Sequence, residues 1–249
     1  MTELWLIGIG TGNPLHVTLE GQHALRNATT VLIPRKGSGK EDLAHIRRAI
    51  LKDVGAEARV IHFDMPERDA GLPYQQRVEA WHDAIARRWQ RALAQADPGP
   101  TALLVWGDPG LYDSTLRIAA RLDPTPVVRV VPGITALQAL TAAHAIPFNE
   151  VDGAVTVTTG RRLRARGWPQ GATTVVVMLD GECSFQNIDP QGVEIWWGGF
   201  LGMPEQVLEA GPLATTAIKI VRTRAIARER HGWIMDTYLL RKTSSSPFN

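Results

Sequence analysis

The chain has little cysteine and no long apolar run, and each shortage excludes a class of protein. Among its 249 residues there is one cysteine, Cys183, which excludes an internal disulfide framework and a zinc site built from cysteines. No segment reaches the ~20 apolar residues needed to cross a bilayer, and no charged N-terminal region precedes an apolar core. We therefore expect a cytoplasmic protein with no membrane partner.

Metal-ligand and nucleotide signatures are also missing. The seven histidines form no pair at close helical spacing, which predicts no metal site. A glycine turn, Gly8, Gly10 and Gly12, follows the first apolar run, but Asn13 stands where the dinucleotide fingerprint has its last glycine. The lysine and hydroxyl of a phosphate-binding loop are absent too. A nicotinamide-dependent oxidoreductase is therefore disfavoured, and the turn is either ligand-binding or a tight strand-to-helix connection.

Charge is nearly balanced overall, with a formal net charge of +2, but arginine is clustered. The two clusters are Arg161, Arg162, Arg164 and Arg166, and Arg222, Arg224, Arg228 and Arg230. Such clusters suit an anionic partner, either nucleic acid or a small polycarboxylate, or they form a solvated basic face. No series of stacking aromatic residues accompanies them, which argues against a nucleic-acid partner.

Strand-like and helix-like stretches alternate through the first half, which predicts an α/β architecture with a largely parallel sheet. The first strand is expected at Leu4–Ile9. The clearest helix spans residues 74–94, where apolar residues recur at spacings of three and four and the tryptophans are expected in the core. The second half reads as richer in strands, and Ala217–Thr223 and Trp233–Leu240 are predicted to be antiparallel neighbours.

The predicted domain boundary is the sequence "DPTP" at Asp123–Pro126. Two prolines at alternate positions can neither continue a helix nor lie inside a central strand. The expected domains are residues 1–123 and 127–249, both α/β.

Further glycine turns follow later strands. "WGDPGLYDS", Trp106–Ser114, contains Asp108, which either accepts from a ligand or forms an Asx turn or helix cap. "PGITALQAL", Pro132–Leu140, contains Thr135, which caps its helix, contacts a ligand, or does both. "VVVMLDG", Val175–Gly181, ends another apolar strand. Because ligands bind beyond the carboxyl ends of strands in open α/β sheets, these turns predict one cleft.

These stretches also carry a family resemblance. "GIGTGNPLHVTLEG", "WGDPGLYDS", "VPGITALQAL", "VVVMLDG" and "GGFLGMPEQVLEAGPLA", in this order, resemble the tetrapyrrole methylases of corrin and sirohaem synthesis. The resemblance covers Leu4 to about Leu240. It implies two α/β domains with a cleft between them that binds S-adenosylmethionine, a homodimer, and an anionic tetrapyrrole as substrate.

The resemblance assigns cofactor contacts residue by residue. They are Trp106, Gly107, Asp108, Leu111, Thr135, Ala136, Met178, Leu179 and Gly211. One departure is that "MLDG" replaces the family's Tyr-Met-Gly, so either Met178 or Leu179 makes that contact.

The first glycine loop is expected to line the substrate trough. The family reads Gly-x-Gly-Pro-Gly-Asp-Pro there, whereas this chain has Thr11 and Asn13 in place of the proline and aspartate. The substrate residues implied are Gly10, Thr11, Gly12 and Arg35, and Lys36 and the Arg161–Arg166 cluster are further partners for substrate carboxylates.

Methyl transfer from a sulfonium needs little acid or base chemistry, because the leaving thioether is neutral. Catalysis then rests on placing a ring carbon in line with the methyl group and excluding water. The Trp-rich helix "YQQRVEAWHDAIARRW" after "DMPER" is most similar to a branch that methylates precorrin-5 at C-1 and releases an acetyl group as acetic acid. That second step needs a polar side chain, and Tyr112, Asp113 and His144 are the candidates.

Other functions stay open on the sequence. Within the family, methylation of another ring position or of uroporphyrinogen III is the alternative. Methyltransferases of this fold also act on protein or ribosomal RNA. A cofactor- or tetrapyrrole-binding protein without turnover is the alternative from a different class.

Overall fold

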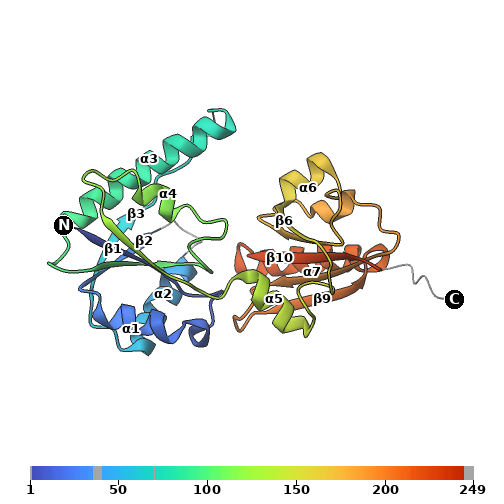
Figure 1. Ribbon diagram of the computed structural model, residues 1–249, viewed down its shortest axis with the longest axis horizontal. Coiled ribbons are helices and arrows are strands. Elements are labelled where there is room, and N and C mark those ends of the chain that lie inside the picture. The colour runs from blue at the N-terminus through green and yellow to red at the C-terminus, as the bar shows by residue number, and fades with distance from the viewer. Residues whose placement is uncertain (1, 36–40, 70, 244–249) are drawn as a thin grey trace. The chain divides into compact units, whose positions relative to one another are not determined.

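Residues 2–35, 41–69 and 71–243 are described by the computed structural model, and they fold as two units with one sheet each (Figure 1). Unit 1 is Met1–Thr135 and unit 2 is Ala136–Asn249. Both combine helices with a five-stranded sheet, so the predicted α/β class is confirmed.

All strands of the first sheet run parallel, as predicted. They are β1 (Glu3–Gly8), β2 (Thr30–Arg35), β3 (Arg59–Asp64), β4 (Thr101–Val105) and β5 (Val127–Val131), in the order β3-β2-β4-β1-β5. β1 is buried on both faces, because Leu4 and Leu6 enter one core while Trp5 and Ile7 enter the other. A continuously apolar strand is the sequence signature of this position.

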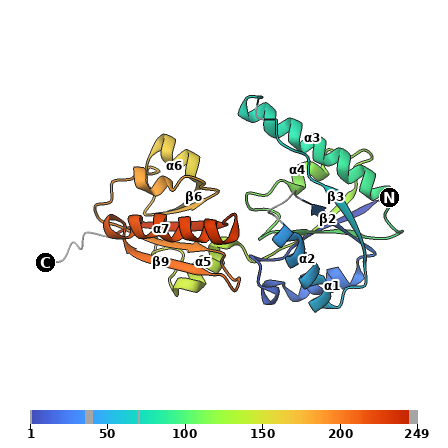
Figure 2. The same cartoon turned by 180° about the vertical axis from the view of Figure 1, so that it is seen from behind.

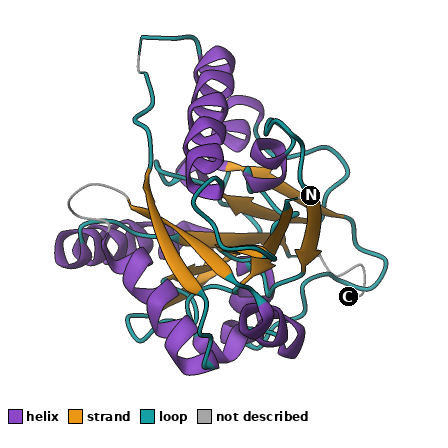
Figure 3. Cartoon of the chain, turned by 90° about the vertical axis from the view of Figure 1, so that its left-hand side faces the viewer, coloured by secondary structure: helices purple, strands orange, loops and turns teal. Residues whose placement is uncertain are grey.

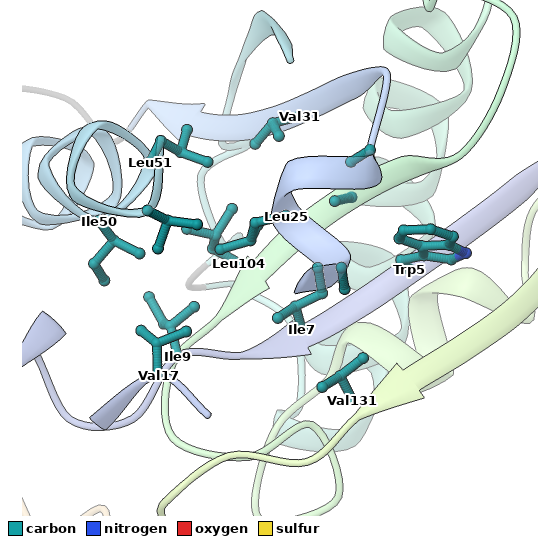
Figure 4. Close-up of a cluster of buried hydrophobic side chains, with 14 of the residues drawn as sticks. Trp5, Ile7, Ile9, Val17, Leu25, Val31, Ile50, Leu51, Leu104 and Val131 are labelled. Carbon is teal, nitrogen blue, oxygen red and sulfur yellow. The ribbon is translucent and has the colours of Figure 1, made fainter. Parts of the chain in front are cut away.

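Helices cover both faces of this sheet (Figure 3). α1 (Leu19–Asn27) and α2 (Glu41–Val54) pack on one face, whose core is drawn in Figure 4. α3 (Tyr74–Leu93) and α4 (Thr115–Ala119) pack on the other. The short helix η1 (Pro14–His16) precedes α1.

The helix predicted at 74–94 is confirmed as α3, and its tryptophans are placed as expected. Trp89 is 2% exposed and its ring meets Phe63 edge-on at 6.4 Å. Trp81 is half-buried, and its Nε1–H donates to the carbonyl oxygen of Pro66 at 2.9 Å.

The division between the units lies later than the boundary expected at Asp123–Pro126. β5 pairs in parallel with β1, from Glu3 opposite Val127 to Ile7 opposite Val131. The strand that follows the two prolines therefore completes the first sheet, and the chain passes to unit 2 only after Thr135. The prolines end a helical turn and lead into an edge strand, which is a place that proline tolerates.

The second sheet is mixed. Its strands are β6 (Val155–Thr159), β7 (Thr174–Met178), β8 (Val193–Gly199), β9 (Val207–Pro212) and β10 (Asp236–Lys242), in the order β6-β7-β10-β8-β9. β6 and β7 are parallel, and the other neighbours are antiparallel. The helices are α5 (Ala136–His144), α6 (Gly160–Arg166), η2 (Ser184–Asn187) and α7 (Leu213–His231).

The strand predicted at Ala217–Thr223 is wrong, because this segment lies inside α7, which packs on β8 and β9 (Figure 2). Ile and Val in this stretch favoured a strand. Its buried positions recur at helical spacings: Leu213, Thr216, Ile220, Arg224 and Ala227. Weak local propensity gives way to the packing of this face. The predicted strand near Trp233 is real and is β10, whereas β8 and β9 were not predicted.

One buried histidine in unit 1 has unusual surroundings. His82 on α3 is 3% exposed, and neither ring nitrogen has a hydrogen-bond partner within the described residues. Burial lowers the pKa of His82 below 6.5, and the charge of Arg121 lowers it further. Protonation of this ring therefore costs more in the native state than in the unfolded chain.

We expect this histidine to make the protein sensitive to acid. Below about pH 6.5 the unfolded chain binds a proton that the native state resists, so the free energy of unfolding falls until the native pKa is passed. His82→Leu removes this titration. Urea unfolding between about pH 7 and pH 5 should show a smaller loss of stability for the variant, with the remaining slope from His16 and His62, whose pKa values burial also lowers. Equal slopes would contradict the prediction.

Candidate functional site

The first sheet changes its direction of winding after β3, because the chain moves from β1 through β2 to the edge strand β3 and then returns through α3 to β4. The loop after β1 leads to α1 on one face, whereas the loop after β4 leads to α4 on the opposite face. Because β1 and β4 are neighbours, their loops diverge at the carboxyl ends of the strands. Open α/β sheets bind ligands at this kind of edge.

Three glycines bring the backbones of this edge into direct contact. A methyl group on Gly133 would lie 2.2 Å from the carbonyl oxygen of Gly107 and 2.8 Å from the backbone of Gly8. A methyl group on Gly8 would lie 2.6 Å from the backbone nitrogen of Gly133. Side chains cannot occupy such distances, so positions 8 and 133 require glycine. The glycine turns therefore have a structural reason, and they leave an edge made of backbone.

Gly10 and Gly107 form a two-way backbone bridge. The N–H of Gly107 donates to the carbonyl oxygen of Gly10 at 2.7 Å, and the N–H of Gly10 returns a bond at 3.3 Å. Both residues are left-handed, with φ of 73° and 66°. A methyl group on Gly107 would meet nothing closer than the Cα of Thr135 at 3.9 Å, which is an ordinary van der Waals contact.

Asp108 ties two loops together. Its Oδ1 accepts from the N–H of Gly110 at 2.7 Å, and its Oδ2 accepts from the N–H of Gly133 at 2.9 Å. The first bond is the Asx turn that the sequence left open. The second links the loop after β4 to the loop after β5. Asp108 is half-buried.

The other predicted residues of the β4 loop differ in exposure. Trp106 is half-buried against the core beneath α1 and α2, and Leu111 is half-buried. Tyr112 is 43% exposed and left-handed, with φ of 49°. Asp113 Oδ1 accepts from both the N–H and the hydroxyl of Thr115, so this carboxylate starts α4. Of the catalytic candidates here, Tyr112 is therefore the one presented to solvent.

Arg47 on α2 joins this edge and was not predicted. Pairing between β2 and β4 stops one residue before Leu104, and Pro34 in β2 has no N–H to continue it. Instead the Nε–H of Arg47 donates to the carbonyl oxygen of Leu104 at 3.1 Å. Burial lowers the pKa of Arg47 to about 10, against the opposing charge of Asp113. The proline inside a strand was the one local signal of this arrangement.

The residues expected to line the substrate trough differ in their exposure to solvent. Thr11 is 4% exposed, with its Oγ1 3.3 Å from Nδ1 of His16. Gly12 is left-handed, with φ of 120°. Arg35 ends β2 and is exposed. Lys36 lies outside the described residues.

In unit 2, Met178 and Leu179 are the two candidates for one cofactor contact, and the turn after β7 exposes them differently. Met178 is the last residue of β7 and is half-buried. Leu179 is left-handed, with φ of 53°, and 67% exposed. A bulky residue in this conformation is uncommon and marks a constrained position. Leu179 is thus the side chain that the turn presents to solvent.

Asp180, which follows Leu179, was not singled out from the sequence. It is 7% exposed, and its carboxylate accepts four hydrogen bonds from three residues, Glu182, Ser184 and Tyr238. An acidic residue directly after a continuously apolar strand was the available signal.

The remaining predicted residues of unit 2 lie apart from this turn. Gly211 is on β9, which two strands separate from β7, so Gly211 and Leu179 are at least ~14 Å apart across the sheet. Ala136 and His144 begin and end α5. Nε2 of His144 lies 3.0 Å from the carbonyl oxygen of Trp197, so this nitrogen carries the proton.

Two further observations concern the class of site. Among the described residues, no group of three or more His, Cys, Asp or Glu side chains is placed to hold a metal ion. No helix in the described part of the chain is long and apolar enough to cross a membrane.

Comparison with known proteins gives consistent relatives. The family model of the tetrapyrrole (corrin/porphyrin) methylases matches residues 3–217. A precorrin-6A synthase (deacetylating) from Sinorhizobium sp is 43% identical over 97% of this chain and 96% of its own length. The crystal structure of a cobalamin-synthesis-related protein (CobF) from Corynebacterium diphtheriae has a TM-score of 0.84 and 35% identity, over 98% of this chain and 100% of that one.

A more distant relative shares the fold. It is the uroporphyrin-III C-methyltransferase of Thermus thermophilus, solved in complex with S-adenosylhomocysteine. Its TM-score is 0.56 and its identity 19%, over 96% of this chain and 97% of that one.

The glycine contact predicts a severe effect of one methyl group. Gly133→Ala is expected to lower the free energy of unfolding by ~3 kcal/mol, because the backbones of Gly8 and Gly107 cannot both move away. Gly181→Ala is the control, since a methyl group there has nothing within 4 Å and should cost about 0.5 kcal/mol or less. Urea unfolding of both variants measures this, and equal losses would contradict the account.

The two-loop role of Asp108 predicts that its amide cannot replace it. Asp108→Asn presents an NH₂ group to one of the two backbone N–H donors, which should cost ~2 kcal/mol of stability. Asp189→Asn is the matched control, because Asp189 accepts one bond, from the N–H of Gln191, which the asparagine oxygen can keep. Thermal unfolding compares the two. No loss of stability in either variant, or an equal loss in both, would show that the hydrogen bond between Asp108 and Gly133 contributes little to stability.

Proposed function

Because the chain belongs to the tetrapyrrole (corrin/porphyrin) methylases, we propose that it methylates precorrin-5 at C-1 and releases the acetyl group as acetic acid, which gives precorrin-6A. The observation that carries this proposal is the 43% identity with a precorrin-6A synthase (deacetylating) over nearly the full length of both chains. The chain is a methyltransferase, and the proposal concerns its substrate and the ring position.

The proposed methyl donor is S-adenosylmethionine, with S-adenosylhomocysteine as product. The segments 8–13, 106–114 and 132–135 contain two aspartates and no lysine or arginine. Such loops suit a ligand that carries a sulfonium and an amine, and they do not suit a diphosphate, which needs cations. The bound donor supplies an electrophilic methyl group on a neutral leaving thioether.

The residues proposed to hold the donor contribute mainly backbone. In unit 1 they are Trp106, Gly107 and Leu111 in the loop after β4, with Asp108 for the donor's positive charge and Thr135 beside Gly107. In unit 2 the proposed contacts are Ala136, Met178, Leu179 and Gly211, with the exposed Leu179 as the principal apolar one. Backbone fixed by glycine packing positions a ligand at no cost of side-chain entropy.

Loss of the acetyl group needs a water molecule at its carbonyl carbon. The bond from that carbon to C-1 breaks, its electron pair passes to C-1, and C-1 then takes the methyl group. Tyr112, Asp113 and His144 stay the proposed residues for the proton of the water. Tyr112 is supported by its exposure, since Asp113 and His144 are half-buried.

The substrate is a polycarboxylate, and its proposed partners are Gly10, Thr11, Gly12 and Arg35. The exposed guanidinium of Arg35 can bind a carboxylate through paired hydrogen bonds. Thr11 is buried, so it would act by shaping the loop. The homodimer and the cytoplasmic location stay predictions.

Mass spectrometry of a turnover reaction tests the function. The protein is incubated with S-adenosylmethionine and precorrin-5 generated in situ, and the product is expected to gain one methyl group and lose one acetyl group, with acetate released. Methylation with the acetyl group retained would keep a methyltransferase but remove the deacetylation. Methylation only of uroporphyrinogen III, or no turnover, would contradict the proposal.

A further inference from the structure

We propose that Asp180 is a positioning residue, whose buried carboxylate holds the turn after β7 so that Leu179 is presented to the methyl donor. The inference rests on the proposed function, since it assumes that S-adenosylmethionine contacts this turn. It takes Leu179, rather than Met178, as the residue that contacts the methyl donor. Asp180 itself would not touch the donor.

The exposed position of Leu179 needs an external restraint. Leu179 is 67% exposed, so it gains little from burial, and its left-handed backbone conformation is unfavourable for a residue with a Cβ atom. Strain of this kind persists only when the surrounding structure fixes it. The residue before it belongs to β7 and the residue after it is Asp180, so the restraint must come from one of these two sides.

The carboxylate of Asp180 supplies that restraint through separate segments. Oδ2 accepts from the N–H of Ser184 and from the hydroxyl of Tyr238, both at 2.6 Å. Oδ1 accepts from the hydroxyl of Ser184 at 2.8 Å and from the N–H of Glu182 at 3.1 Å. Tyr238 lies on β10, so the turn is tied to the neighbouring strand as well as to η2. These four bonds satisfy both oxygens of a buried carboxyl group.

The space that the carboxylate of Asp180 occupies is left by a glycine. A methyl group on Gly160, at the start of α6, would lie 2.2 Å from both Cγ and Oδ1 of Asp180. The glycine therefore leaves room that Asp180 fills. Burial, and then the charge of Asp180, raise the pKa of Tyr238 far above its usual value, so the phenol stays protonated and donates. Phe185 packs edge-on against this ring at 5.2 Å.

A second buried group fixes the backbone of the same residue. Nη2 of Arg224, on α7, donates to the carbonyl oxygen of Asp180 at 3.3 Å. Nε of Arg224 is bound to Oδ2 of Asp236 at 2.9 Å, and that oxygen also accepts from Nε1 of Trp197. Both the side chain and the carbonyl of Asp180 are thus held, and Leu179 has no freedom to turn inward.

These bonds leave Asp180 unsuited to chemistry of its own. Its carboxylate is 7% exposed and its two oxygens already accept four hydrogen bonds, so it does not reach a ligand. Its effect must pass through Leu179. A loss of this anchor is then expected to weaken donor binding in proportion to what Leu179 contributes.

Binding of S-adenosylhomocysteine to the full chain, measured by calorimetry, tests this. Tyr238→Phe removes one bond to Asp180 and keeps the ring, and it should weaken binding about tenfold. Thr174→Val is the matched control, because Thr174 is buried at the other end of β7 and accepts one bond from Arg241. It should lose comparable thermal stability and keep the affinity within about twofold. Ser184→Ala, which removes the hydroxyl bond, serves as a second variant if Tyr238→Phe folds poorly.

A double-mutant cycle separates positioning from general loosening. In a Leu179→Ala background, Tyr238→Phe is expected to change the affinity by less than about twofold, since the residue it positions is gone. Wild-type affinity in Tyr238→Phe or in Leu179→Ala, or the same loss in both backgrounds, would overturn the inference alone. A wild-type protein that does not bind S-adenosylhomocysteine would overturn both this inference and the proposed methyl donor.

Discussion

The contact of three backbones at Gly8, Gly107 and Gly133 is the constraint on which the first unit depends. Neighbouring parallel strands lie about 4.8 Å apart, and where their loops touch there is no space for a Cβ atom at Gly8 or Gly133. This contact brings the carboxyl ends of β4, β1 and β5 to a single edge. Asp108 then bridges two of the loops, and the edge is left with backbone groups and carboxylates and no cation from these loops.

Such an edge suits the chemistry of the family. A sulfonium methyl group is already activated, and the group that leaves is neutral, so positioning contributes more than proton transfer. Glycine-fixed backbone is rigid, and its cost is met during folding rather than at each turnover. The absence of an obvious catalytic dyad in the sequence is consistent with this division, and only the acetyl group calls for a polar side chain.

The second unit uses a different device. Its turn after β7 is held by buried polar groups, since Arg224 forms an ion pair with Asp236 and donates to the backbone carbonyl oxygen of Asp180. Burial raises the pKa of Asp236, and its hydrogen bond to Arg224 opposes that shift. Buried charges that are fully bonded permit few alternative arrangements. A rigid turn that presents an exposed leucine is the result.

Local patterns in the sequence were enough for the parallel α/β class, for helix α3 and for the glycine turns, because periodicity and glycine report directly on burial and backbone conformation. The motifs also sufficed for the family. They did not reveal that β5 belongs to the first sheet or that Ala217–Thr223 is helical, since strand partners and packed faces are chosen by residues far along the chain. Arg47 and Asp180 were missed for the same reason. Their partners, Leu104 and Tyr238, become neighbours only when the sheets assemble, so the tertiary structure alone decided their roles.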